Sequence, residues 1–160
     1  MCDLVHTTFE KGEVIVLMEE KTGVSRQFVA SPAVAGLAQD QVSGALRAWG
    51  LPLLVSDAVL VMGKLAANAV EASRAAEVIK VYVGRGAGEV VLAVWDGCDA
   101  RPVTRHVELS LETLDLCPDR FDDNGGWGLS IVENLAARCW VDPTPPRGKW
   151  VCAALKADVR

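Results

Sequence analysis

The sequence has few of the residues that build metal sites and disulfide frameworks. It contains two histidines, and its five cysteines are odd in number and include no pair with Cys-x-x-Cys spacing. No zinc-type ligand pattern joins the cysteines to His6 or His106. The default for the cysteines is therefore the free thiol of a reducing compartment. The apolar neighbours of Cys139 and Cys152 predict that these two thiols lie in the core.

The sequence also lacks a net positive charge, an apolar run of membrane-spanning length and a recognisable secretion signal. The net charge is −5, whereas a general binder of nucleic acid or of membrane surfaces needs a basic patch. No uninterrupted apolar run reaches the length of a membrane span, and the N-terminus lacks the charged-then-apolar layout of a signal peptide. We therefore expect a cytoplasmic protein that binds neither nucleic acid directly nor a membrane.

The composition is that of an ordered globular protein. Hydrophobic residues make up 51% of the 160 residues and charged residues 23%, which is enough for one domain with a sizeable core. No internal repeat or linker divides the chain. We expect residues 1–24 to be an N-terminal extension, with a short strand at 14–18, and residues 25–160 to form the domain.

Periodicity and turn signals give an order of helices and strands. Ser31 followed by Pro32 predicts a helix start that runs to Gly50, and Ser56 with Asp57 predicts a second start. The expected elements are a strand at 26–30, a helix from 32 to 49, a helix at 58–75, strands at 78–83 and 90–95 joined by a loop at 84–88, a long loop at 98–124, a helix after 124, and strands at 139–141 and 150–155.

The helix at 58–75 is apolar nearly all round, with a polar stripe on one face. Lys64, Asn68 and Glu71 are spaced by four and three residues, which places them on that face. A buried asparagine must find hydrogen-bond partners. Asn68 either bonds to neighbouring backbone or offers its oxygen to a ligand or to Mg²⁺, which prefers oxygen ligands.

Two further features carry candidate chemistry. Asp96 and Gly97 end an apolar strand, and a carboxylate there needs donors, either backbone N–H groups or the amino group of an adenine. Three glycines, Gly125, Gly126 and Gly128, lead directly into the last amphipathic helix. They leave backbone N–H groups uncovered at the positive end of a helix dipole, which suits a phosphate, although a plain turn gives the same pattern.

The order of these features resembles the GHKL ATPase fold of histidine kinases, DNA gyrase and heat-shock protein 90. Within that group it is most similar to the small bacterial anti-sigma factors that are also serine protein kinases, over residues 26–156. The resemblance implies an α/β fold, the Bergerat ATP-binding fold: a two-layer sandwich of a mostly antiparallel, mixed sheet with helices on one face.

The resemblance also assigns roles to the motifs, with ATP and Mg²⁺ as cofactors. Asn68 would ligate the Mg²⁺ that bridges the phosphates, and Asp96, with Gly97 beside it, would accept a hydrogen bond from the adenine amino group. The backbone of the glycine box would cradle the phosphates beneath a lid at residues 100–124. The members of that box are Gly125, Gly126, Gly128 and Leu129.

Two departures from the family pattern bear on activity. Lys64 occupies the catalytic position where the family has the glutamate that acts as general base, and a lysine ammonium has no lone pair. Glu71 is roughly 10 Å further along the helix, too far to replace it. Lys64 either pairs with Glu71 or neutralises phosphate charge. Near the last strand, where relatives often have a threonine that helps to bind adenine, Trp150 either fills the base pocket or packs in the core. Trp127 replaces an arginine.

The function implied is that of an ATP-binding regulator of transcription, of the anti-sigma factor/serine/threonine protein kinase class. It would bind a sigma factor and release it when an anti-anti-sigma protein competes. The alternative is a protein-binding module with attenuated or lost catalysis, because Lys64 replaces the general base. The resemblance also implies a homodimer, through the first helix or the sheet edge.

Overall fold

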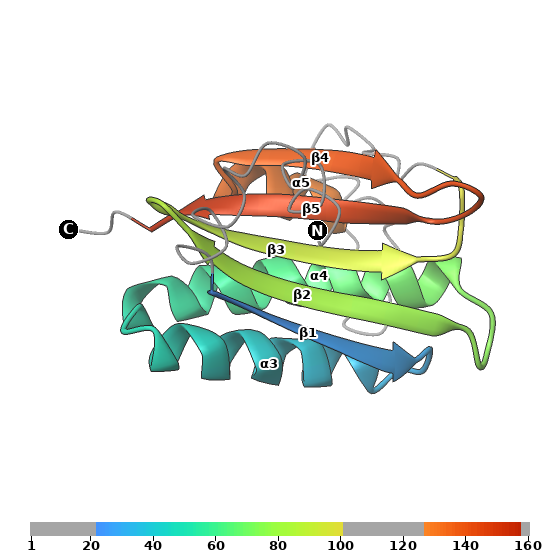
Figure 1. The fold of residues 1–160 in the computed structure, drawn as a ribbon, viewed down its shortest axis with the longest axis horizontal. Helices are drawn as coiled ribbons and strands as arrows, with labels where there is room; N and C mark the ends of the chain where they lie inside the picture. The colour runs from blue at the N-terminus through green and yellow to red at the C-terminus, as the bar shows by residue number, and fades with distance from the viewer. Residues whose placement is uncertain (1–21, 101–126, 158–160) are drawn as a thin grey trace, which may run out of the picture.

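The computed structural model describes residues 22–100 and 127–157. Its strands form one five-stranded sheet in the order β1-β2-β3-β5-β4, and every neighbouring pair is antiparallel (Figure 1). This confirms the expected mostly antiparallel sheet, and the described strands contain no parallel pair. The strands are β1 (Thr22–Val29), β2 (Val78–Gly86), β3 (Glu89–Asp96), β4 (Arg138–Pro143) and β5 (Lys149–Lys156).

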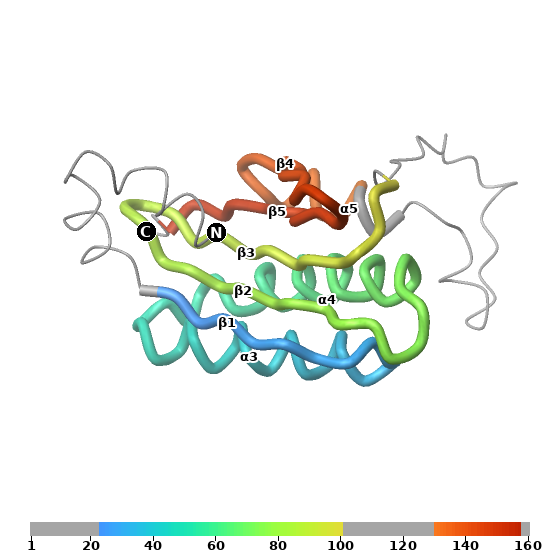
Figure 2. The backbone as a smooth tube through the Cα atoms, turned by 45° about the vertical axis from the view of Figure 1, so that its right-hand side comes forward, coloured from blue at the N-terminus to red at the C-terminus, as the bar shows by residue number. Residues whose placement is uncertain are grey.

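The helices cover one face of this sheet, as predicted (Figure 2). They are α3 (Val34–Ala48), the short 3₁₀ helix η2 (Pro52–Leu54), α4 (Val55–Ala72) and α5 (Trp127–Leu135). α3 and α4 pack side by side, α4 lies against β3, and α5 packs against α4. α4 is therefore the central helix of the second layer.

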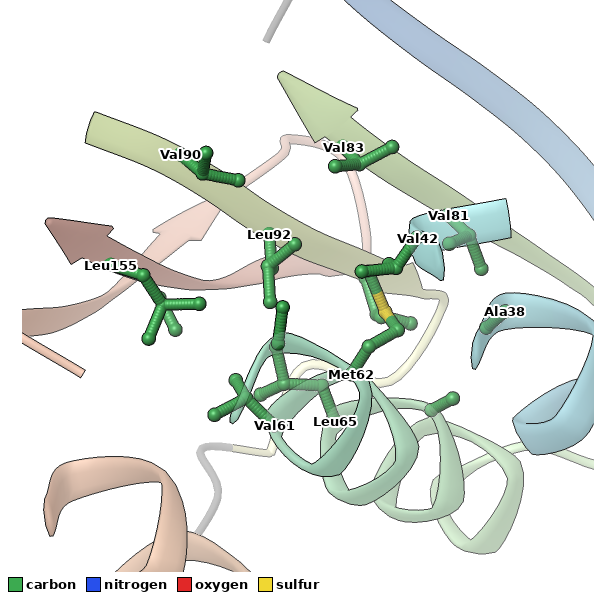
Figure 3. Packing of buried hydrophobic residues seen from close by; sticks show 14 of the residues in the cluster. Ala38, Val42, Val61, Met62, Leu65, Val81, Val83, Val90, Leu92 and Leu155 are labelled. Carbon is green, nitrogen blue, oxygen red and sulfur yellow. The ribbon is translucent and has the colours of Figure 1, made fainter. Parts of the chain in front are cut away.

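The core lies between this layer and the sheet (Figure 3). Met62 and Leu65 of α4 and Val42 of α3 are 0–2% exposed and face the sheet. Alternate residues of the strands point at them, among them Val81 and Leu92, which are both fully buried. Each such side chain contributes about 1.5–3 kcal/mol of hydrophobic stabilisation. Strand alternation thus fixes which residues share the helix-facing side of the sheet.

The helix boundaries differ from the predicted ones. α3 begins at Val34, not after Ser31: the Val34 N–H donates to the Ser31 carbonyl oxygen at 3.1 Å, so Ser31 and Pro32 form a turn and Ser31 caps no helix. α4 begins at Val55, because η2 runs directly into it. It ends at Ala72, where the extended backbone of Ser73 (ψ 149°) stops the helix three residues before the predicted end.

The hairpin between β2 and β3 is tighter than predicted. Gly84 and Gly86 belong to the ladder, where they pair with Val91 and Glu89. Only Ala87 and Gly88 turn the chain, and Gly88 has a positive φ of 70°. A Cβ at Gly84 would lie 2.3 Å from the Tyr82 hydroxyl oxygen, so the ring of that tyrosine covers the glycine. Glycine here permits aromatic packing on the sheet instead of a loop.

α4 also corrects the reading of apolar runs. The segment Pro52–Ala72 spans 21 residues with a mean hydropathy of 1.6, which is long and apolar enough to cross a membrane by composition alone. Its buried residues belong to the core cluster with the sheet, as expected of a central core helix.

Cys152 is buried, as predicted, whereas Cys139 is exposed because β4 is an edge strand. The strand predicted at 14–18 and most of the long loop lie outside the described residues.

Candidate nucleotide-binding site

The predicted base-reading and metal-binding residues lie on elements that meet at one end of the sandwich. β3 ends with Asp96, and its register partner Lys149 begins β5. The C-terminal end of α4, the end of β3 and the β4–β5 hairpin lie at the same end of the molecule (Figure 1). The fold thus brings the predicted residues of these elements to one candidate site.

Asp96 is buried and its carboxylate is already bound within the protein. Asp96 is 2% exposed, and its Oδ1 accepts a hydrogen bond from the Cys98 N–H at 2.9 Å. Oδ1 also accepts one from Nζ of Lys149 at 2.8 Å. Lys149 is itself 4% exposed, and its Nζ donates to the Cys98 carbonyl oxygen at 2.9 Å. The backbone donor weighed from the sequence is present, and a buried ion pair accompanies it.

The strand register explains why Lys149 reaches this carboxylate. Residues directly opposite on antiparallel strands point to the same face. Val94 and Val151 are such a pair, and both contact the core on the helix side. Asp96 and Lys149 are the next pair in phase, so they also face the helices.

The same register places Trp150 outside the site. Trp150 pairs with Trp95, one residue out of phase with Lys149, so its indole lies on the sheet face away from the helices. The prediction that Trp150 fills the base pocket is therefore wrong, and so is its placement in the core between the sheet and helices. Lys149, to which the sequence patterns assigned no role, occupies the helix-facing position. Its alternation with Val151 and Ala153 was the signal that could have identified it.

The hairpin before Lys149 is anchored to β3 and the loop after it. The Gly148 N–H donates to Oδ1 of Asp99 at 2.8 Å, and Thr144 accepts a hydrogen bond from the Trp95 indole at 2.8 Å. Gly148 has a φ of 87°, and a Cβ there would lie 2.5 Å from the Trp95 ring. Glycine is required at this position by both conformation and space.

An ion pair joins the hairpin to the start of β2. Nη2 of Arg147 lies 3.4 Å from Oε1 of Glu77. The pKa of Glu77 is lowered first by a hydrogen bond from the Arg74 backbone N–H and then by Arg147. The pair is exposed and contributes little stability by itself, but it links the turn after α4 to the hairpin that carries Lys149.

The α4 residues of the predicted site are only partly buried. Lys64 and Asn68 are half-buried, and Glu71 is exposed. Within residues 22–100 and 127–157, no ion pair joins Lys64 to Glu71, so that expected pair is absent. In the same ranges the Asn68 side chain makes no hydrogen bond to protein, so the alternative of a backbone-bonded asparagine is not realised. The amide is available to a ligand.

The glycine box is only partly within the described residues. Gly128 and Leu129 lie in the first turn of α5, which begins at Trp127. Gly125 and Gly126 lie outside the described residues, as does the predicted lid. The predicted helix start is thus present, and the helix packs against α4. The phosphate contacts themselves remain predictions.

The residues present fit ATP better than they fit a protein-built metal site. A carboxylate can accept up to about four hydrogen bonds, so Asp96 retains acceptor capacity for an amino group. Asn68 offers one amide oxygen. Among the described residues, no group of three or more His, Cys, Asp or Glu side chains is placed so that it could hold a metal ion. A Mg²⁺ here would depend on phosphates and water for most of its ligands.

Comparison with protein families identifies the domain. Residues 28–155 match the family model described as a histidine kinase-like ATPase domain. The matched range contains the site residues on α4, β3, α5 and β5. No curated protein matches the chain.

Proposed function

Because the chain belongs to the histidine kinase-like ATPase domain family, we propose that it is an ATP-binding regulatory protein of the anti-sigma factor/serine protein kinase class. ATP binding follows from the family, and the regulatory class is supported by the motif order of the sequence. In this role the protein binds a sigma factor in the cytoplasm and releases it to an anti-anti-sigma competitor.

Each residue of the site has a role that its chemistry supports. Asp96 accepts a hydrogen bond from the adenine amino group, and Gly97 continues the backbone beside it. Asn68 presents its unpaired amide oxygen to Mg²⁺ or to the phosphates. The backbone N–H groups at the start of α5 receive phosphate oxygens. ATP, when bound, supplies a transferable phosphoryl group.

The position of Lys64 favours binding without efficient phosphoryl transfer. Lys64 is half-buried on α4, and the nearest acid on its helical face, Glu71, is exposed and unpaired with it. A protonated lysine cannot take the proton of an attacking hydroxyl. General-base catalysis typically contributes about 10²–10⁴ in rate. The protein is therefore a switch that senses nucleotide, with attenuated or absent kinase activity.

One observation carries the nucleotide assignment: a buried carboxylate ends a core strand beside the helix that bears an available asparagine amide. Calorimetric titration of the full chain with ATP, with and without Mg²⁺, tests it. We expect saturable binding that Asp96→Asn weakens about tenfold or more. The matched control is Asp142→Asn, the same change on the face away from the helices, where the carboxylate bonds to the Trp140 indole. Equal binding by both variants, or no binding by wild type, would refute the assignment.

The kinase half is tested separately. The protein is incubated with labelled ATP and its cognate anti-anti-sigma partner, and phosphoserine is measured. We expect label at or near background for the wild-type chain. Efficient transfer would show that Lys64 does not attenuate catalysis and would restore the full kinase assignment.

A further inference from the structure

In the ion pair between Lys149 and Asp96, both charged groups already have partners within the protein. Nζ of Lys149 lies 2.8 Å from Oδ1 of Asp96, and the two side chains are 5% and 3% exposed. The same oxygen accepts the Cys98 N–H, and the same ammonium donates to the Cys98 carbonyl oxygen. Each charge is neutralised and hydrogen-bonded in a place that water barely reaches, so the pair holds together before any ligand arrives.

The backbone around Lys149 keeps the ammonium at this place. Gly148, the preceding residue, is held by Asp99 and packs against Trp95 and the Asp96 carbonyl oxygen. The long lysine stem therefore starts from a fixed point and ends on two fixed acceptors. A lysine on an exposed loop would lose much more side-chain entropy to make the same contacts.

We propose that Lys149 competes within the chain for the carboxylate that reads the base, and thereby sets the nucleotide affinity of the domain. This inference rests on the proposed role of Asp96. A charged donor makes a stronger hydrogen bond to a carboxylate than a neutral amino group does. Adenine therefore meets a carboxylate that is already neutralised. Expelling Lys149 instead would strand a buried ammonium, which is more unfavourable still.

Removing the lysine charge reverses this balance. In Lys149→Met the Asp96 carboxylate is buried without a cation, and an incoming amino group relieves part of that penalty. The hydrogen bond from the adenine amino group to the unpaired Asp96 carboxylate should therefore raise the affinity for the nucleotide about tenfold or more. Loss of a positive charge near a polyphosphate has the opposite general effect, a weaker affinity. The sign of the change therefore separates the two effects.

Calorimetric titrations of the full chain with ATP and with adenosine test this inference. Adenosine has no phosphates, so it reports on the base site without the polyphosphate term. We expect Lys149→Met to bind adenosine about tenfold more tightly than wild type, and to bind ATP more tightly by a smaller factor, because the lost positive charge also weakens the attraction for the phosphates. The matched control is Arg147→Met, which removes the neighbouring exposed cation, paired with Glu77 and not with Asp96. Its adenosine affinity should stay within about twofold of wild type.

A second variant guards against poor folding of the first. Lys149→Gln keeps an amide donor for Asp96 without the charge, and we expect it to fold and to bind adenosine more tightly than wild type by a smaller factor. Unchanged or weaker binding by folded Lys149 variants, while wild type binds ATP through Asp96, overturns the inference and leaves ATP binding intact. Absence of binding in wild type and in every Lys149 variant overturns both. Binding by the variants alone supports the competition.

Discussion

The buried pair of Asp96 and Lys149 makes a strong prediction about stability. Removing one member of a buried ion pair costs about 3–5 kcal/mol, because the other charge stays buried without compensation. Lys149→Met leaves the Asp96 carboxylate without its cation, and because that side chain is only 3% exposed, solvent cannot compensate its charge. For a chain of this size, 1 kcal/mol lowers the melting temperature by about 2–4 °C. The expected fall in melting temperature is therefore about 6–20 °C.

The partner substitution and the double variant complete the test. Asp96→Asn keeps an oxygen that accepts the Cys98 N–H but loses the charge that balances Lys149, so we expect a smaller loss of about 2–3 kcal/mol. The double variant Asp96→Asn/Lys149→Met contains no buried charge at this place. Its stability should lie within about 2 kcal/mol of wild type, so the two losses are strongly non-additive.

Urea unfolding followed by tryptophan fluorescence gives each free energy of unfolding. The control is Glu89→Gln, which breaks the exposed pair with Arg138, 34% and 56% exposed, and should change the free energy by less than about 1 kcal/mol. If the double variant lost the sum of the single losses, Asp96 and Lys149 would not be coupled. The competition proposed at the base site would then lose its physical basis.

Three other predictions follow from the structure. Lys64→Glu restores a proton acceptor, so ATP hydrolysis measured by phosphate release should rise about 10²–10⁴-fold; an unchanged rate would mean that another step is limiting. The pKa of Glu77 is lowered from 4.5 mainly by the Arg74 N–H, so its carboxylate stabilises the fold at neutral pH. Glu77→Gln should lower the melting temperature at pH 7, and that difference should vanish as the pH falls below 4.5 and through the lowered pKa; a difference that persists in acid would contradict this. Gly148→Ala should destabilise the fold more than Gly88→Ala in urea unfolding, because both have positive φ but only Gly148 places a Cβ 2.5 Å from an atom of β3. Equal losses would show that conformation alone matters.

The order of elements was predictable because each one carries its own periodic signal. β-branched runs marked β2 and β3, and apolar repeats at helical spacing marked α3 and α4. The pairing of those strands then followed from a short hairpin. The glycines before Leu129 and the polar stripe of Lys64 and Asn68 placed the candidate site on these elements. The fold could therefore be anticipated from local patterns joined to a family resemblance.

Element ends were less predictable because several local signals compete there. Ser31 followed by Pro32 is a sound helix-start pattern, but the chain uses it for a turn, and the helix begins at Val34. Gly84 and Gly86 suggest a loop, yet the Tyr82 ring packs over Gly84 and the ladder continues. In both places the packing of neighbouring elements decides between two locally acceptable conformations.

The role of Lys149 could not be predicted without the strand register. A shift of one residue between β3 and β5 would have put Trp150 beside Asp96 and turned Lys149 to the opposite face. Both outcomes fit the local sequence, because a tryptophan and a lysine can each occupy either face of a strand end. Only the pairing of Asp96 with Lys149 across the two strands distinguishes them.

In the proposed site, Lys64 and Lys149 together would shift nucleotide recognition from the base toward the phosphates. Lys149 pairs with the Asp96 carboxylate, so under the role proposed for Asp96 the free energy gained from recognising the adenine amino group falls. A cation at Lys64 would add attraction for the polyphosphate of the proposed ligand, where an acid would repel it. Discrimination is a difference between two affinities, and a phosphate term common to all nucleotides adds nothing to it. We therefore expect weak discrimination between ATP and GTP in wild type, and sharper preference for ATP once Lys149 is replaced by methionine.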